Sequence, residues 1–123
     1  MGRLLVFLAR LNEPDGKPLP PPGPGLRGIG IEQGAAVLLD PDGKCKVVGK
    51  GAAYFVEPVQ DAVLDPARQS TADARLISLT ASILKVPSGH TFDLTKWQGE
   101  AIPYTLTVKD SAIRSTQPGG SVY

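Results

Sequence analysis

Residues 28–58, GIGIEQGAAVLLDPDGKCKVVGKGAAYFVEP, contain the clearest secondary-structure pattern in this chain of 123 residues. Ile29 and Ile31 alternate with glycines, as the residues of a strand with two different faces do. The apolar run at 35–39 is typical of a buried strand. Residues 40–43, Asp-Pro-Asp-Gly, predict a tight turn, because proline presets one backbone dihedral and glycine accepts a positive one.

The chain beyond this turn continues with strand patterns. Residues 44–48 and 52–56 read as returning strands that are interrupted at Gly49–Gly51. Apolar residues then alternate with serine and threonine at 77–83, and again with threonine at 104–108. Such alternation predicts half-buried strands, so most of the chain is expected to form β-sheet.

The first residues have helical periodicity instead. Leucines recur with the spacing of one helix face, at positions 4, 5, 8 and 11. Asn12 is suited to the end of a helix and Pro14 prevents its continuation. The pattern predicts a helix over residues 2–12, which is short enough to need another element to pack against.

The length of the chain, residues 1–123, indicates one domain or part of one, and composition divides it into segments. The chain has 14 glycines and 12 prolines, a larger share than average. Residues 13–27 predict a Pro/Gly-rich loop, residues 28–110 the β-rich region, and residues 111–123 a loose tail. We therefore expect the isolated chain to form one N-terminal helix followed by mostly β-strands.

Charge and cysteine content argue against several classes of function. A formal net charge of +1 gives no electrostatic reason to expect binding to nucleic acid or to a membrane surface. No apolar run has the length of a membrane-spanning helix, and the N-terminal apolar run lacks the cleavage site of a secretion signal. Cys45 is the only cysteine, so no internal disulfide and no oxidising compartment are required. We expect a cytoplasmic protein.

The glycines that begin at Gly28 do not form a nucleotide-binding loop. A dinucleotide fingerprint needs G-x-G-x-x-G at the start of a helix, whereas Gln33 stands at the third glycine and a strand-like run follows. We therefore expect no nucleotide cofactor.

Side chains suited to catalysis are few. His90, the only histidine, lies in a turn after Ser88 and shortly before Asp93, but the chain has no G-x-S-x-G nucleophile elbow. Cys45 lies between two lysines that would lower its pKa, although a small buried residue is the commoner role. One histidine and one cysteine do not make a zinc site, so we expect no metal and no cofactor.

Two stretches together resemble one family. Residues 1–8, MGRLLVFL, are similar to the start of the helix that follows the catalytic histidine in cyanophycinase-like serine peptidases, relatives of the aspartyl dipeptidase peptidase E. Residues 28–33, GIGIEQ, are similar to the Gly-Ile-Gly-Ile-Asp-Glu segment of that family. Residues 35–39 and 47–54 resemble the hairpin that follows it, and residues 86–94, VPSGHTFDL, are more weakly similar.

The resemblance implies an α/β fold related to class I glutamine amidotransferases, with this chain as its C-terminal portion. It also implies exopeptidase chemistry on aspartyl and β-aspartyl-arginine peptides by a serine nucleophile, a histidine base and an acid. Arg3 matches the arginine of the family that helps to bind the substrate's carboxylates. Glu32 and Gln33 match the Asp-Glu pair, so Gln33 stands where the family usually has its acid. An amide cannot stabilise an imidazolium by charge.

The family's serine elbow and histidine motif would lie before Met1. We therefore expect a truncated serine-type peptidase, a C-terminal fragment of a hydrolase that carries out no proteolysis alone. Its partner would be an upstream N-terminal half or a second copy of the chain. The alternative is a free-standing β-rich binding or interaction module without catalysis. A fragment would leave a sheet edge and a helix face open, and a complete module would not.

Overall fold

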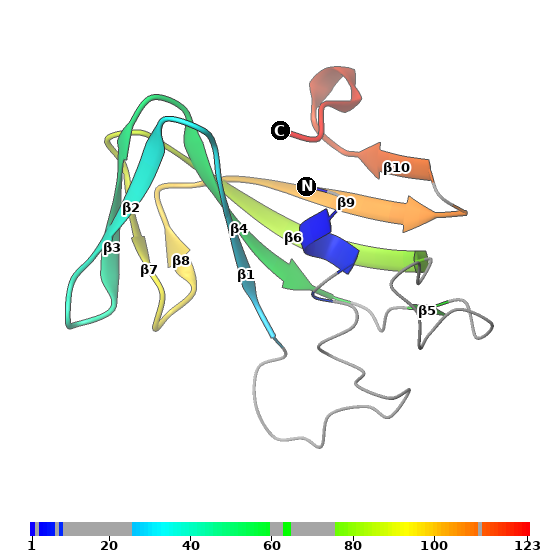
Figure 1. Cartoon of the computed structure of the whole chain (residues 1–123), viewed down its shortest axis with the longest axis horizontal. Helices are drawn as coiled ribbons and strands as arrows, with labels where there is room; N and C mark the ends of the chain where they lie inside the picture. Colours follow the sequence, from blue (N-terminus) through cyan, green and yellow to red (C-terminus); the bar gives the residue numbers. More distant parts are fainter. Residues whose placement is uncertain (2, 7, 9–25, 60–62, 65–75, 111) are drawn as a thin grey trace.

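The computed structural model describes residues 1, 3–6, 8, 26–59, 63–64, 76–110 and 112–123 (Figure 1). Residues 3–6 and 8 are helical, and the rest of the described chain is mostly antiparallel β-sheet. The strands are β1 (Gly28–Ile31), β2 (Ala35–Leu39), β3 (Lys44–Gly49), β4 (Ala52–Pro58), β5 (Val63–Leu64), β6 (Leu76–Pro87), β7 (Thr91–Asp93), β8 (Gln98–Gly99), β9 (Ile102–Lys109) and β10 (Ala112–Ser115), followed by the 3-10 turn η3 (Pro118–Gly120). The prediction of one N-terminal helix followed by mostly β-strands is confirmed for the described residues.

The two sheets are the two halves of one bent meander. Sheet A has the order β1-β4-β6-β9-β10, with β5 also paired to β6, and sheet B has the order β2-β3-β7-β8. Ile31 pairs with Ala53 in sheet A, and Ala35 pairs with Gly49 in sheet B. From the first pair to the second, both chains advance by the same number of residues, so the two pairs belong to one continuous antiparallel register. The hairpin that the sequence predicts therefore runs through both sheets and bends between Ile31 and Ala35. Figure 1 shows the strands of sheet B together at one end of the molecule.

The N-terminal helix covers one face of sheet A. Leu5 and Leu8 are buried against the sheet. A Cβ added at Gly28 would lie 3.0 Å from a δ-carbon of Leu4 and from one of Leu8. This close approach explains why glycine stands in β1 on the side that faces the helix.

Two apolar cores lie on opposite faces of sheet A. Alternate residues of β4 enter them, since successive side chains of a strand point to opposite faces. The first core lies under the helix and consists of Leu5, Leu8, Ala52, Tyr54, Val56, Leu79, Ala81, Ile83, Tyr104, Leu106 and Val108. The second lies between sheets A and B and consists of Cys45, Val47, Ala53, Phe55, Val86 and Phe92.

Strand β2 differs from its prediction. The sequence predicts a buried strand at 35–39, but Leu38 and Leu39 are 57% and 60% exposed. Among the described residues β2 pairs only with β3, so it is the edge strand of sheet B and its side chains lack neighbours on one side. Residues 2, 7 and 9–12 of the predicted helix and 13–25 of the predicted loop lie outside the described residues.

The C-terminal residues, which the sequence predicts to be loose, are held against sheet A. Strand β10 pairs antiparallel with β9. The Tyr104 hydroxyl donates to the Val122 carbonyl (3.1 Å), and the Gln117 amide donates to the Ser121 carbonyl (3.0 Å). Strand β10 forms because β9 offers an edge for pairing, which the local sequence does not reveal.

Candidate functional site

Glu32 lies where the chain leaves β1 and sheet A. Its N–H donates to the Ala52 carbonyl (3.1 Å), but its own carbonyl accepts from the N–H of Ala35 (3.0 Å). The Ala52 N–H, which would otherwise donate to that carbonyl, donates instead to Glu32 Oε2 (3.0 Å). The carboxylate of Glu32 therefore replaces a main-chain acceptor at the bend.

Tyr54 holds the other carboxylate oxygen of Glu32. The Tyr54 hydroxyl donates to Glu32 Oε1. This bond lowers the pKa of Glu32, the Ala52 N–H and the charge of Lys85 act in the same direction, and burial of the carboxylate opposes them. Burial and the neighbouring Glu32 raise the pKa of Tyr54. At neutral pH the pair is an ionised carboxylate bound by a protonated phenol.

Two glycines make room for the bend. Gly51 has φ of 107°, and an added Cβ would overlap Glu32 Oε2. Gly49 has φ of 93°, and an added Cβ would overlap the carbonyl oxygen of Gly34. Glycine meets both requirements, because it has no Cβ and tolerates positive φ. The strand interruption seen in the sequence is therefore part of the bend.

A small cavity of about 230 Å³ adjoins the Glu32–Tyr54 pair. Its lining consists of Met1, Leu4, Gly30, Ile31, Glu32, Tyr54 and Tyr123. The Tyr123 ring meets the Tyr54 ring edge-on, with centroids 6.0 Å apart. The Met1 nitrogen donates to the Tyr123 hydroxyl (2.6 Å), and Figure 1 shows the two ends of the chain close together. The start of the helix, the bend and the C-terminal residues thus meet at this cavity.

The three residues matched to the family's site are only partly brought together. Glu32 faces the cavity, while Gln33 is exposed in the turn beyond it. Arg3 lies on the helix near the cavity but is not among the residues that line it. Its side chain is exposed and makes no hydrogen bond or ion pair with other described residues. Sequence reasoning missed Tyr54, for which the only local signal is its position shortly after Gly51.

His90 and Ser88 do not form a catalytic pair. The Ser88 hydroxyl donates to the Gly49 carbonyl (2.8 Å), and His90 Nδ1 lies 3.3 Å from the Ser88 carbonyl. Asp93 Oδ1 accepts from the main-chain N–H of Thr95 (2.9 Å), away from the histidine. These side chains therefore support turns rather than a proton-transfer relay.

Cys45 and the remaining metal-ligating side chains give no sign of a reactive centre. Cys45 is 3% exposed, and burial raises the pKa of its thiol, so the thiolate is disfavoured. Within the described ranges, no three residues among the histidine, the cysteine and the carboxylates are grouped so as to hold a metal ion.

A second and larger cavity, of about 590 Å³, lies on the face of sheet B that points away from the core. Its charged and amide side chains are Asp40, Lys44, Lys46, Asp93, Lys96 and Gln98. No sequence motif predicts this cavity, although Lys44 and Lys46 alternate with buried residues in β3.

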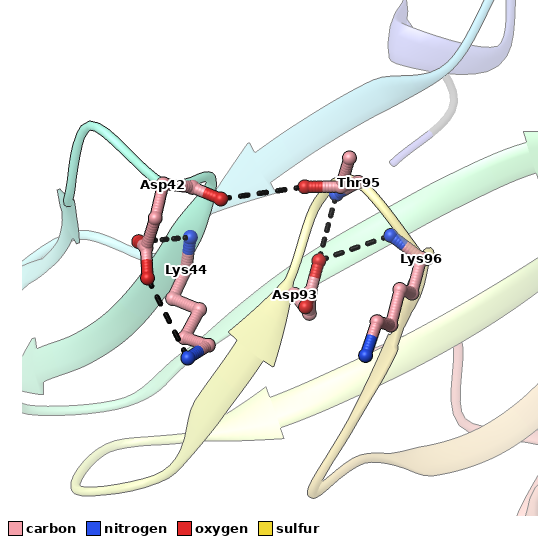
Figure 2. A network of polar contacts seen from close by, with 5 residues as sticks. All are labelled: Asp42, Lys44, Asp93, Thr95 and Lys96. Carbon is pink, nitrogen blue, oxygen red and sulfur yellow. Dashed lines mark hydrogen bonds and ion pairs between the residues drawn. The ribbon is translucent and has the colours of Figure 1, made fainter.

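Figure 2 shows the polar network beside this cavity. The Lys44 ammonium lies 3.5 Å from an Asp42 carboxylate oxygen, and the Thr95 hydroxyl donates to the Asp42 carbonyl (3.5 Å). Asp93 Oδ1 accepts from the N–H groups of Thr95 and Lys96, at 2.9 and 3.0 Å. These main-chain bonds lower the pKa of Asp93. The network joins the turn between β2 and β3 to the turn between β7 and β8.

Comparisons with protein-family models, with curated proteins and with solved structures found no match to this chain. None of the helical residues that the structure describes belongs to a helix long and apolar enough to cross a membrane.

Proposed function

We propose that this chain is the C-terminal portion of a cyanophycinase-like serine peptidase with an α/β, class I glutamine amidotransferase-like fold. The complete enzyme would be a cytoplasmic exopeptidase that acts on aspartyl or β-aspartyl-arginine peptides. The chain alone would supply part of the wall of the active site and no nucleophile.

The observation that carries the proposal is that the stretches resembling the family pack together as one unit. Leu4 and Leu8 of the first stretch lie against Gly28 of the second. Glu32, which matches the family's aspartate, is held by Ala52 and Tyr54, which lie at the end of the third. Segments separated by tens of residues in the sequence thus meet at one bend.

The geometry also supports inactivity of the isolated chain. Covalent hydrolysis needs a nucleophile, a base and an acid within hydrogen-bond distance of one another. The Ser88 hydroxyl donates a hydrogen bond to the Gly49 carbonyl. Both carboxylate oxygens of Glu32 already accept hydrogen bonds, one from the Ala52 N–H and one from the Tyr54 hydroxyl. Gln33 is exposed but carries no charge.

Arg3 is the residue to which we assign a substrate contact. Its guanidinium is exposed on the first turn of the helix and has no ion pair with other described residues, so it is available to a carboxylate. Substrate binding by Arg3 would occur only once the upstream half provides the rest of the site.

A hydrolysis assay tests the proposal. The purified chain is incubated with β-aspartyl-arginine, and free arginine is measured by chromatography, with a complete cyanophycinase-like peptidase as positive control. We expect no release above the rate without protein. Turnover that is lost in His90→Ala would contradict the proposal, because the active centre would then lie within this chain.

A free-standing binding module is the second candidate, and the cavity on sheet B favours it. The cavity offers lysines and carboxylates, a lining suited to a small ligand of mixed charge. This candidate predicts a monomer that unfolds cooperatively and binds no dye specific for apolar surfaces. The fragment hypothesis predicts dye binding or self-association.

A further inference from the structure

The cavity beside Glu32 combines a carboxylate with two aromatic rings. Among the described side chains that line it, Glu32 is the only one that carries a charge at neutral pH. Tyr54 and Tyr123 also line it, and their rings lie 6.0 Å apart with planes inclined by 77°. Two rings at this angle can contact one ligand from two sides. The rest of the lining is apolar or glycine and consists of Met1, Leu4, Gly30 and Ile31.

The Glu32 carboxylate has hydrogen-bond donors but no ion pair within the part of the chain that the structure describes. One of its oxygens accepts from the Ala52 N–H and the other from the Tyr54 hydroxyl. The ion pairs among the described residues lie elsewhere. The hydrogen-bonding needs of the carboxylate are therefore met, while its negative charge has no cation in contact with it.

Cationic groups of the chain already lie against both rings. The Lys85 ammonium is 5.6 Å from the centroid of the Tyr54 ring, and the Met1 nitrogen donates to the Tyr123 hydroxyl (2.6 Å). Neither group forms an ion pair with Glu32. Aromatic faces attract cations because the face of the ring is the negative part of its quadrupole. The surroundings of the cavity thus favour positive charge.

We infer that this cavity binds the alkylated ammonium group of a small molecule, such as a trimethylammonium head group. Aromatic rings recognise such groups through their faces, and the carboxylate supplies the opposite charge. An alkylated ammonium needs no hydrogen-bond acceptor, so it suits a carboxylate whose two oxygens are already bonded. Its methyl groups suit the apolar walls. The inference rests on the cavity alone and holds whether or not the peptidase relationship does.

The size of the cavity limits the ligand. Its volume is about 230 Å³, and one water molecule occupies about 30 Å³ in the liquid. Pockets for drug-sized ligands have about 300–1,000 Å³, so this one suits a head group of about four non-hydrogen atoms. So few atoms give limited contact, and the dissociation constant is expected to be about 1 mM.

A nuclear magnetic resonance titration with choline tests the inference. Amide shifts are recorded at constant ionic strength, and the amides of residues 30–32 are expected to change and to saturate with choline. The comparison ligand is the neutral isostere of choline, in which a tert-butyl group replaces trimethylammonium. It has the same shape but no charge, and is expected to cause no saturable change at these amides.

Two substitutions separate the charge from the ring. Glu32→Gln keeps an acceptor for the bend but removes the charge, and is expected to weaken choline binding about tenfold. Tyr123→Ala removes a ring that is 53% exposed, and is expected to weaken it about threefold. Asp110→Asn is the matched control: it removes the same charge from an exposed turn position whose φ of 49° asparagine tolerates. It leaves the affinity unchanged.

Circular dichroism verifies that each variant is folded before its affinity is compared. Three outcomes would each overturn the inference. The first is no change at residues 30–32 with choline, and the second is an equal response to the neutral isostere. The third is an affinity that neither Glu32→Gln nor Tyr123→Ala reduces. None of these outcomes bears on the hydrolysis assay, so the inference and the proposed function can fail separately.

Discussion

The guanidinium of Arg27 lies over the ring of Trp97, with its central carbon 4.4 Å from the ring centroid. The same guanidinium forms an ion pair with Glu57 of β4 at 2.6 Å. Trp97 in turn packs edge-on against Phe55 and Phe92 in the core between the sheets. Arg27 thus links the edge of sheet A to the turn between β7 and β8. Trp97 lies in this turn and has φ of 52°.

Arg27→Ala tests this link between the edge of sheet A and the turn that contains Trp97. The substitution removes a cation–π contact and a partly exposed ion pair, so the free energy of unfolding is expected to fall by about 1–2 kcal/mol. Trp97 is the only tryptophan, and its fluorescence should shift to longer wavelength as the ring gains contact with water. Arg114→Ala, at an exposed position in β10, serves as control. An unchanged emission spectrum in Arg27→Ala would contradict the predicted role.

Glu32→Ala tests the carboxylate at the bend. Without it, the Ala52 N–H and the Tyr54 hydroxyl lose their acceptor, and we expect the free energy of unfolding to fall by about 2–3 kcal/mol. The neighbouring Gln33→Ala, in an exposed turn position, should change it by less than about 0.5 kcal/mol. Urea denaturation measures both. Equal effects of the two substitutions would show that the carboxylate does not stabilise the bend.

Acid should destabilise the protein partly through Glu32. Its pKa is lowered in the folded state, so its contribution to stability is present above the ordinary glutamate pKa of about 4.3 and is lost as pH falls below it. Glu32→Gln keeps an acceptor but does not titrate, and its stability should therefore fall less steeply with acid. Residual acid sensitivity is expected, because hydrogen bonds also lower the pKa values of Asp93 and Glu100. Superimposable pH profiles of variant and wild type would contradict this prediction.

Gly51→Ala tests the steric requirement of the bend. Alanine at φ of 107° is strained, and its Cβ would overlap the Glu32 carboxylate, so we expect a loss of at least about 3 kcal/mol in unfolding free energy. Gly89→Ala is the matched control, because Gly89 has φ of 88° but open space around it. It should cost only the backbone strain, about 1–2 kcal/mol. Similar losses in both variants would argue against the close approach at Gly51.

Local periodicity was sufficient to predict most of the strands in the described residues. The alternation at 77–83 and 104–108 corresponds to β6 and β9, and the turn at 40–43 separates β2 from β3. Leucines at helical spacing likewise predicted the helical residues 3–6 and 8. These patterns are local because each depends on one element burying one face.

The bend and the sheet edges could not be predicted in the same way. The bend depends on a bond between Glu32 and Tyr54, which are 22 residues apart in the sequence. The exposure of Leu38 and Leu39 depends on β2 having one partner strand, which an apolar run does not reveal. Strand β10 forms against an edge provided by β9.

Sequencing the genomic DNA immediately upstream of the Met1 codon tests the proposed peptidase relationship most directly. We expect an open reading frame, in the same or an adjacent gene, that encodes a Gly-x-Ser-x-Gly elbow followed by an Asp-x-His-Phe motif. Upstream DNA that encodes neither motif would contradict the account, and the chain would then have to be explained as a β-sheet module in its own right.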